Sequence, residues 1–141
     1  LRSPSGRNIK PCFFVFVENK DMLEKLSHAK EHGGEFLSGA ALGIVICADE
    51  SLSNVWLEDS CIAATTVQYT ASSLDLGSCW IQLRDRKYND SMSSEEYIVQ
   101  LLNLPERTRV LSIIAMGYPD EIKDEISKKD LDYNKIIIEN M

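Results

Sequence analysis

The chain has 141 residues, of which 44% are hydrophobic and 26% charged, and its formal net charge is −7. This length fits one domain with a core of its own. The acidic balance and the lack of a basic block argue against nucleic acid or an anionic membrane surface as the main partner.

The first part of the chain contains no visible signal peptide or transit segment. It begins at Leu1 rather than Met and in the middle of a pattern, so we expect further residues upstream. After a polar loop to Lys10, hydrophobic spacing predicts four elements. They are a strand buried on both faces at Cys12–Glu18, an amphipathic helix at Asp21–His32, a short helical turn at Glu35–Ala41 and a second buried strand at Gly43–Ala48.

A long helix beginning at Trp56 follows these elements. No charged residue occurs between Asp59 and Asp75, and a helix without a charged face is typically buried nearly all round. Ser53 or Asn54 is expected to cap its start, and Gly77 is expected to end it. The segment is too short and too polar to span a membrane.

The remainder of the chain again alternates strands with helices. The predicted elements are a strand at Ser78–Leu83, a polar loop at Lys87–Ser93, a helix at Ser94–Asn103, a strand at Arg109–Met116, an exposed charged segment at Asp120–Asp132 and a terminal strand at Tyr133–Glu139. The last strand is expected at a sheet edge or as an arm to a partner. The alternation predicts a sheet covered by helices.

The cysteines show no metal-ligand spacing and lie in apolar segments: Cys12, Cys47, Cys61 and Cys79. We expect buried thiols in a reducing compartment, the cytoplasm. Both histidines, His28 and His32, fall on the polar helix, which disfavours a catalytic cysteine.

The usual catalytic motifs are absent from the sequence: there is no Gly-x-Ser-x-Gly, no phosphate-binding loop, no Gly-x-Gly-x-x-Gly after a strand and no His/Cys cluster. Asp49 and Glu50 are adjacent acids at the end of a predicted strand. Exposure of that strand end to solvent explains them more simply than a role as an acid–base pair. Either the protein is no enzyme, or a bound cofactor supplies the chemistry.

Four separated segments favour the cofactor. They are Pro4-Ser5-Gly6-Arg7-Asn8, the strand Ile44–Ala48, the helix from Asp59 into Leu74–Ile81, and Leu104-Pro105 with the strand ending in Gly117-Tyr118-Pro119. In this order and spacing the chain resembles the nitroreductase family of FMN-dependent NAD(P)H oxidoreductases.

The resemblance implies an α+β fold: a single domain over residues 1–141, built as a three-layer sandwich with a mostly antiparallel sheet flanked by helices and a long buried central helix. It also implies a homodimer joined along that helix, with two FMN molecules in clefts between the subunits. No membrane or nucleic acid is implied as a partner.

The resemblance also assigns the cofactor-binding residues. Pro4, Ser5, Gly6 and Asn8 occupy the positions of the loop that holds the flavin ring, where an asparagine amide can both donate and accept hydrogen bonds. Leu76, Gly77 and Ser78 match the turn whose backbone passes the reactive edge of the flavin. The alternatives are a plain turn at the first site and a plain helix end at the second.

The phosphate site departs from the family pattern. An Arg-rich first helix that would bind the FMN phosphate is absent from this sequence, and the usual Lys-x-Arg near the carboxyl end reads Lys128-Lys129-Asp130. Lys128 is the candidate and Lys123 a weaker one. Arg84 and Arg86 are alternatives, although a solvated strand end explains them as well.

By resemblance, the function is transfer of hydride from NAD(P)H through FMN to an electron-poor acceptor such as a nitroaromatic or a quinone, with ping-pong kinetics and no catalytic side chain. One alternative is a non-catalytic or degraded dimer with weak flavin binding. Another is an FMN-dependent reductive dehalogenase-like enzyme with Lys87–Ser94 as a substrate lid.

Overall fold

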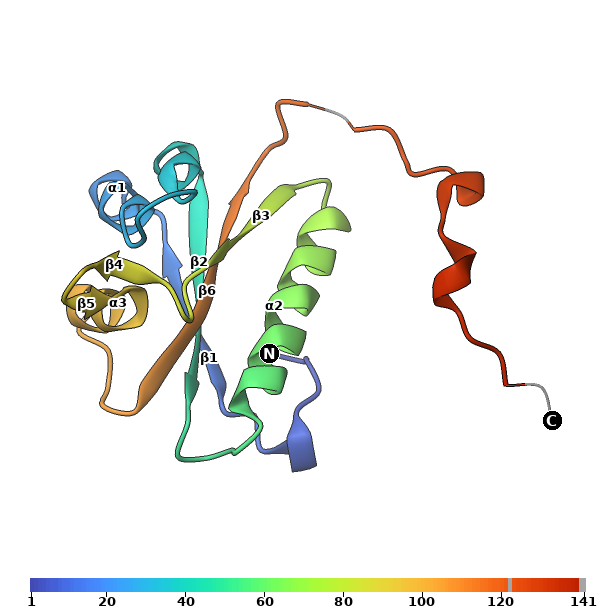
Figure 1. Cartoon of the computed structure of the whole chain (residues 1–141). Coiled ribbons are helices and arrows are strands. Elements are labelled where there is room, and N and C mark those ends of the chain that lie inside the picture. The colour runs from blue at the N-terminus through green and yellow to red at the C-terminus, as the bar shows by residue number, and fades with distance from the viewer. Residues whose placement is uncertain (122, 140–141) are drawn as a thin grey trace.

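The computed structural model describes residues 1–121 and 123–139. Its centre is an antiparallel sheet in the order β1-β2-β6-β3 (Figure 1). The strands are β1 (Cys12–Val17), β2 (Leu42–Asp49), β3 (Gly77–Gln82) and β6 (Thr108–Gly117). The longest strands, β2 and β6, are central and carry continuous runs of buried residues, apolar except for Ser112, as strands covered on both faces do.

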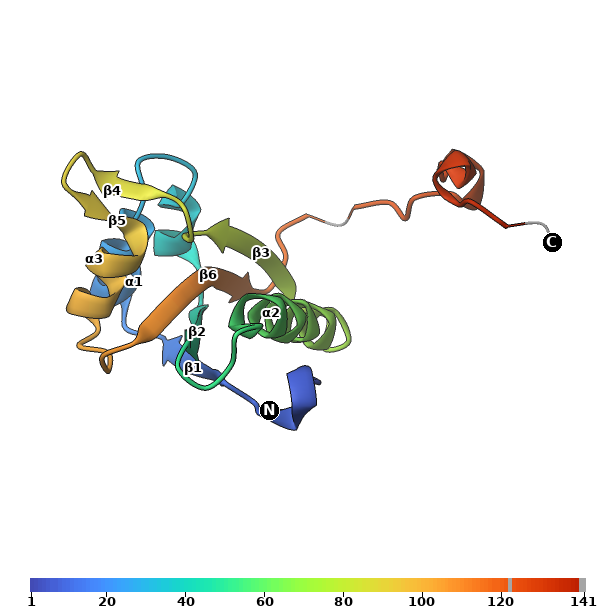
Figure 2. The ribbon, with the colours of Figure 1, turned by 60° about the horizontal axis from the view of Figure 1, so that its bottom comes forward.

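Helices cover both faces of this sheet, as the turned view in Figure 2 shows. The helix α2 (Trp56–Ser72) lies on one face, and α1 (Lys20–Ser27) and α3 (Ser94–Leu101) lie on the other. Short 3₁₀ turns occur at Gly6–Asn8, Glu35–Gly39, Lys128–Asp130 and Tyr133–Lys135. The α+β class, the three layers and the antiparallel sheet are therefore confirmed.

Two hydrophobic cores lie between the three layers, one on each face of the sheet. The larger core joins α1 and α3 to the sheet through residues such as Leu23, Leu26 and Ile98. The smaller core joins α2 to the sheet and contains Ala64 and Ile114. The alanines of α2 let it approach the sheet closely, since a small side chain leaves room for backbone.

The burial of α2 corrects the prediction of a helix covered nearly all round. Within one chain it buries a single stripe that includes Asp59, Ser60, Ala63, Ala64 and Ala71. The opposite side is open, with Tyr69 74% exposed. The strand β1 is also only partly covered, because Phe16 is 65% exposed.

Both ends of α2 differ from the prediction. Val55 occupies the N-cap without a side-chain cap bond, so neither Ser53 nor Asn54 caps the helix. At the other end Leu76 N–H donates to Ala71 O and Asp75 N–H to Ser72 O, which is the Schellman pattern. Asp75 takes the left-handed position at φ 57°, and Gly77 is already in β3.

Three other predictions were wrong in detail. The helix α1 ends at Ser27 rather than His32. The expected loop at residues 87–93 is a small hairpin of β4 (Lys87–Asn89) and β5 (Met92–Ser93), held to α3 by stacking of Tyr88 on Tyr97 at 4.0 Å between ring centroids. The expected terminal strand is a 3₁₀ turn, Tyr133–Lys135, followed by an unpaired segment.

The described residues after β6 are exposed and run away from the body of the molecule (Figures 1 and 2). Ile137 is 94% exposed and Ile138 75% exposed. Across residues 1–121 and 123–139, no helix combines the length and the apolar character that crossing a membrane requires.

Candidate cofactor-binding site

The loop Pro4–Asn8 forms a compact turn beside the first turn of α2. Asn8 N–H donates to Ser5 O at 3.0 Å, and Lys10 N–H donates to Ser5 Oγ at 2.9 Å. Arg7 and Asn8 both adopt left-handed backbone, with φ of 52° and 57°. Such conformations cost free energy for residues other than glycine, although asparagine tolerates them better than most.

Contacts with Asp59 hold this loop against α2. Gly6 N–H donates to Asp59 Oδ1 at 2.7 Å, and Ser53 O–H donates to Asp59 Oδ2 at 3.3 Å. Asp59 is only 3% exposed. The carboxylate lies in the first turn of α2, where the helix dipole favours a negative charge.

A cavity of about 380 Å³ opens beside the loop. Its lining combines the amino-terminal segment with one face of β1 and the start of α2: Leu1, Ser3, Pro4, Ser5, Lys10, Cys12, Phe14 and Asp59. Lys10, Cys12 and Phe14 were missed from the sequence as lining residues. For Cys12 and Phe14 the available signal was their alternation in β1, because alternate strand residues share a face. Lys10 precedes the strand and has left-handed backbone, so this alternation does not apply to it.

The second predicted segment, Leu76–Ser78, lies at the other end of α2. The helix has 17 residues and is therefore about 26 Å long at about 1.5 Å per residue. Leu76, Gly77 and Ser78 are all partly exposed at the start of β3. Within one chain the structure therefore does not bring the two predicted flavin-contacting segments together (Figure 1).

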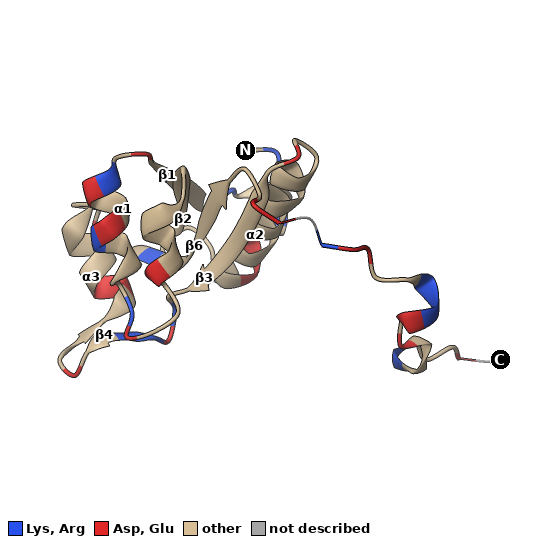
Figure 3. Ribbon diagram, turned by 90° about the horizontal axis from the view of Figure 1, so that it is seen from above, with Lys and Arg blue, Asp and Glu red and all other residues tan. Residues whose placement is uncertain are grey.

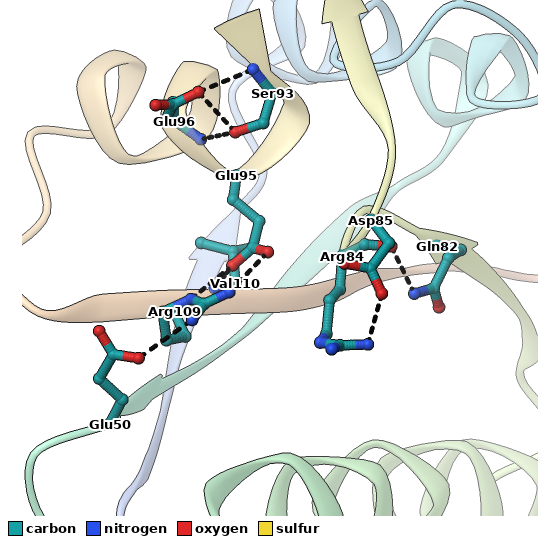
Figure 4. Close-up of polar contacts among 9 residues, drawn as sticks. All are labelled: Glu50, Gln82, Arg84, Asp85, Ser93, Glu95, Glu96, Arg109 and Val110. Atoms are coloured by element: carbon teal, nitrogen blue, oxygen red, sulfur yellow. Dashed lines mark hydrogen bonds and ion pairs between the residues drawn. The ribbon is translucent and has the colours of Figure 1, made fainter.

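Among the described residues, none of the predicted phosphate ligands forms an ion pair or a hydrogen bond with either segment. Lys128 is exposed on the segment that runs away from the body. Lys123 Nζ pairs with Glu121 at 3.0 Å. Arg84 Nη1 pairs with Asp85 Oδ2 at 2.6 Å, and the Arg84 carbonyl accepts from Gln82 Nε2 at 2.9 Å (Figure 4).

The four cysteines are free thiols, but only Cys47 is buried. Burial raises the pKa of its thiol to about 12. Cys12 is half-buried in the cavity wall, 3.5 Å from Ser60 Oγ, and burial raises its pKa as well. Cys61 and Cys79 are exposed, which corrects the expectation of four buried thiols.

Comparison with known proteins adds independent evidence. Residues 27–118 match the family model described as "Nitroreductase family". A curated relative from Archaeoglobus fulgidus, provisionally named NADH dehydrogenase/NAD(P)H nitroreductase, is 33% identical over 128 residues, which are 88% of this chain and 70% of that protein. The chain belongs to the nitroreductase family.

Other relatives agree with this assignment. A protein from Methanothermobacter thermautotrophicus with the same provisional name is 33% identical over 84% of this chain and 60% of its own length. The solved structure of an FMN-dependent nitroreductase from Clostridium difficile R20291 is 41% identical and has a TM-score of 0.95. That match covers 99% of this chain and 82% of the other. The nitroreductase fold inferred from the sequence is therefore confirmed.

Proposed function

We propose that this nitroreductase-family chain is an FMN-dependent oxidoreductase. It takes hydride from NAD(P)H and passes the electrons to an electron-poor acceptor of the nitroaromatic or quinone class, with ping-pong kinetics. Bound FMN supplies the redox chemistry, accepting two electrons from one substrate and delivering them to the next. The names of the relatives in Archaeoglobus fulgidus and Clostridium difficile support both the cofactor and the class of reductant.

The observation that carries the proposal is the separation of the two candidate segments along α2. Pro4, Ser5, Gly6 and Asn8 lie near its first turn, whereas Leu76–Ser78 follow its last turn. Two copies of the chain, related by a two-fold axis and packed along α2, would bring the first segment of one to the second segment of the other. We therefore propose a homodimer with two equivalent flavin sites between the subunits.

The exposed side of α2 supports this dimer. It carries Ile62 and Tyr69, which are 41% and 74% exposed, and Leu74 just after the helix is 63% exposed. Figure 3 shows that α2 carries no lysine or arginine and has its acidic residues only near its first turn. Beyond Asp59 this open face has no charge, and its exposed Ile62 and Tyr69 stand among uncharged Thr and Ser side chains. Large apolar side chains on such a face favour association with protein.

The polar groups of the loop fit the edge of a flavin. The pyrimidine edge of a flavin offers carbonyl acceptors and one N–H donor, and the exposed Asn8 amide can both donate and accept. Ser5 Oγ accepts from Lys10 N–H and keeps its own proton to donate. These groups would orient the cofactor, while Phe14 and Pro4 would exclude water from the cavity beside it.

The carboxyl-terminal segment belongs to the same proposal. Its exposed isoleucines, Ile136–Ile138, would bury their side chains as an arm on the partner subunit. Lys128, on the same arm, remains the candidate for the FMN phosphate, because an arm that crosses to the partner can reach a site far from its own domain. The four free thiols fit a reducing compartment, and we propose the cytoplasm.

Purified protein mixed with FMN tests the proposal directly. We expect a yellow complex with a perturbed visible flavin spectrum, and bleaching of that spectrum by NADH or NADPH under nitrogen. Reoxidation by an added quinone or nitroaromatic should then complete the cycle. A colourless protein that cannot be loaded with FMN would contradict the proposal.

The positions of the predicted phosphate ligands favour one alternative, a non-catalytic dimer that binds flavin weakly. Lys128, Lys123 and Arg84 all lie away from Pro4–Asn8, so one chain provides no assembled phosphate clamp among these candidates. Tight FMN binding with turnover would exclude this alternative. The dehalogenase alternative loses support, because its proposed lid, residues 87–94, packs against α3 on the sheet face opposite α2.

A further inference from the structure

Asp59 is a buried carboxylate that the proposed chemistry does not use. It is 3% exposed, and no lysine, arginine or histidine lies within ion-pair distance of it in the described parts of the chain. Burying an uncompensated carboxylate is costly. The helix N-terminus and two hydrogen bonds offset that cost.

The two oxygens of the Asp59 carboxylate accept hydrogen bonds from two different segments of the chain. Oδ1 accepts the N–H of Gly6 at 2.7 Å, and Oδ2 accepts the hydroxyl of Ser53 at 3.3 Å. Ser53 Oγ in turn accepts the N–H of Val55, the residue before α2, at 3.3 Å. One side chain thus links the loop Pro4–Asn8 to the segment that begins α2.

The contact requires close approach at Gly6. A Cβ on Gly6 would lie 2.7 Å from Val55 Cγ2 and 3.8 and 3.9 Å from the two Asp59 oxygens. A side chain at residue 6 would therefore push the loop away from α2. Gly6 and Asp59 act as a matched pair: Gly6 leaves space, and Asp59 accepts the hydrogen bond from the part-buried Gly6 amide.

We propose that Asp59 is a positioning residue for the flavin site. By holding the Gly6 amide it fixes the adjacent Ser5 and Asn8 in the orientation that presents their polar groups to the cofactor. The left-handed backbone of Arg7 and Asn8 is held in part by this bond, since an unanchored turn would relax to more favourable angles. This inference rests on the proposed function, because the loop that Asp59 holds is the proposed flavin-binding segment.

Four variants test the proposal. Asp59→Ala removes both acceptors, Asp59→Asn keeps one amide oxygen for Gly6, and Gly6→Ala leaves the carboxylate but displaces the loop. Ser94→Ala is the control, because Ser94 is also buried and its Oγ has no hydrogen-bond partner among the described residues. It lies in α3, on the opposite face of the sheet.

Two readouts separate positioning from folding. The first is hydrogen exchange of the Gly6 amide in flavin-free protein, followed by NMR, with exchange of the β2 and β6 amides as the internal reference. The second is the Kd for FMN, measured by quenching of flavin fluorescence. We expect Asp59→Ala to accelerate Gly6 exchange and to raise the Kd about tenfold or more, the loss of one charge-assisted hydrogen bond.

The other variants complete the pattern. Asp59→Asn should give intermediate values, Gly6→Ala should weaken FMN binding as Asp59→Ala does, and Ser94→Ala should match the wild type. If Asp59→Ala fails to fold, Asp59→Asn and Gly6→Ala decide the matter. Unchanged exchange of the residue 6 amide or an unchanged Kd in these variants overturns the inference alone. Wild-type protein that binds no FMN overturns the proposed function with it.

Discussion

Ser93 and Glu96 form a reciprocal cap at the start of α3 (Figure 4). Glu96 N–H donates to Ser93 Oγ at 3.2 Å, while Glu96 Oε2 accepts the Ser93 N–H at 2.8 Å and its hydroxyl at 2.7 Å. We predict that Ser93→Ala lowers the free energy of unfolding by about 1 kcal/mol at neutral pH. Urea denaturation measures this loss.

Ser127→Ala is the matched control for that variant. Ser127 also precedes a helical turn, but its side chain makes no cap bond. It should therefore leave the unfolding free energy unchanged. Equal losses in the two variants would contradict the assignment of the cap.

The same cap predicts a pH dependence. The hydrogen bonds from Ser93 hold the pKa of the Glu96 carboxyl below its ordinary value of 4.5. Because the folded pKa is depressed, this contribution is complete above about pH 4.5 and is lost as pH falls through the folded pKa. The stability difference between wild type and Glu96→Ala should therefore shrink on acidification. A difference that grew towards low pH in urea titrations would be inconsistent with this account.

The site shows what the sequence can supply at the scale of single residues. Pro4, Ser5, Gly6 and Asn8 could be selected because their types suit a flavin edge and their spacing matches a family pattern. The hydrogen bond from Gly6 to Asp59 could not be predicted, because it joins residues 53 positions apart. The spacing of neighbouring residues gives no information about such a contact. Whether these residues bind FMN remains a prediction.

At the scale of elements, Arg109 ties three segments to β6 (Figure 4). Its Nε and Nη2 donate to the two Glu95 oxygens at 3.0 and 3.1 Å, and its Nη1 donates to Glu50 at 3.0 Å. Its guanidinium also lies 4.9 Å from the centroid of the Trp56 ring. These partners come from α3, the end of β2 and the start of α2.

We predict that Arg109→Lys destabilises the fold, because lysine cannot make the paired contact with Glu95 or stack flat on Trp56. Since the Arg109 side chain is 34% exposed, solvent screening limits the expected loss to about 1 kcal/mol. Thermal or urea unfolding measures it. Arg107→Lys, at an exposed residue in the turn before β6, is the control and should leave stability unchanged.

Strands were predictable because their physics is local. The buried runs at Gly43–Ala48 and Arg109–Met116 contain few polar residues, so β2 and β6 differ from the predicted bounds by only one residue at each end. The end of α2 was less predictable, because Asp75 adopts the left-handed conformation usually given to glycine. The hairpin at residues 87–93 was missed because its strands have two and three residues, too few for a periodic pattern.

At the scale of the whole molecule, the uncovered side of α2 and the extended carboxyl-terminal segment point to the same missing neighbour. The structure describes residues 133–139 and shows no strand in them, although the isoleucine run predicted one. A β-branched run can pair only where an edge strand is available. An arm on a second copy would account for both the apolar composition and the exposure of Ile136–Ile138.

A charge on the open face of α2 should separate the subunits. We predict that Tyr69→Glu converts the dimer to monomer, because it would bury an unpaired carboxylate between two apolar helices. Leu52→Glu is the control, since Leu52 is also exposed, at 54%, but lies in the loop before α2. Sedimentation velocity of both variants at several protein concentrations measures the fraction of dimer. A wild-type protein that is itself monomeric would contradict the prediction.

The most direct test of the central claim measures molar mass and flavin content on the same eluting peak. Size-exclusion chromatography with light scattering and visible absorbance, after incubation with FMN, provides both. We predict a particle of twice the 15.9 kDa chain mass that carries all of the protein-bound flavin, at one FMN per chain. A monomer peak that carries stoichiometric FMN, or a dimer that carries none, would contradict a flavin site built between two subunits.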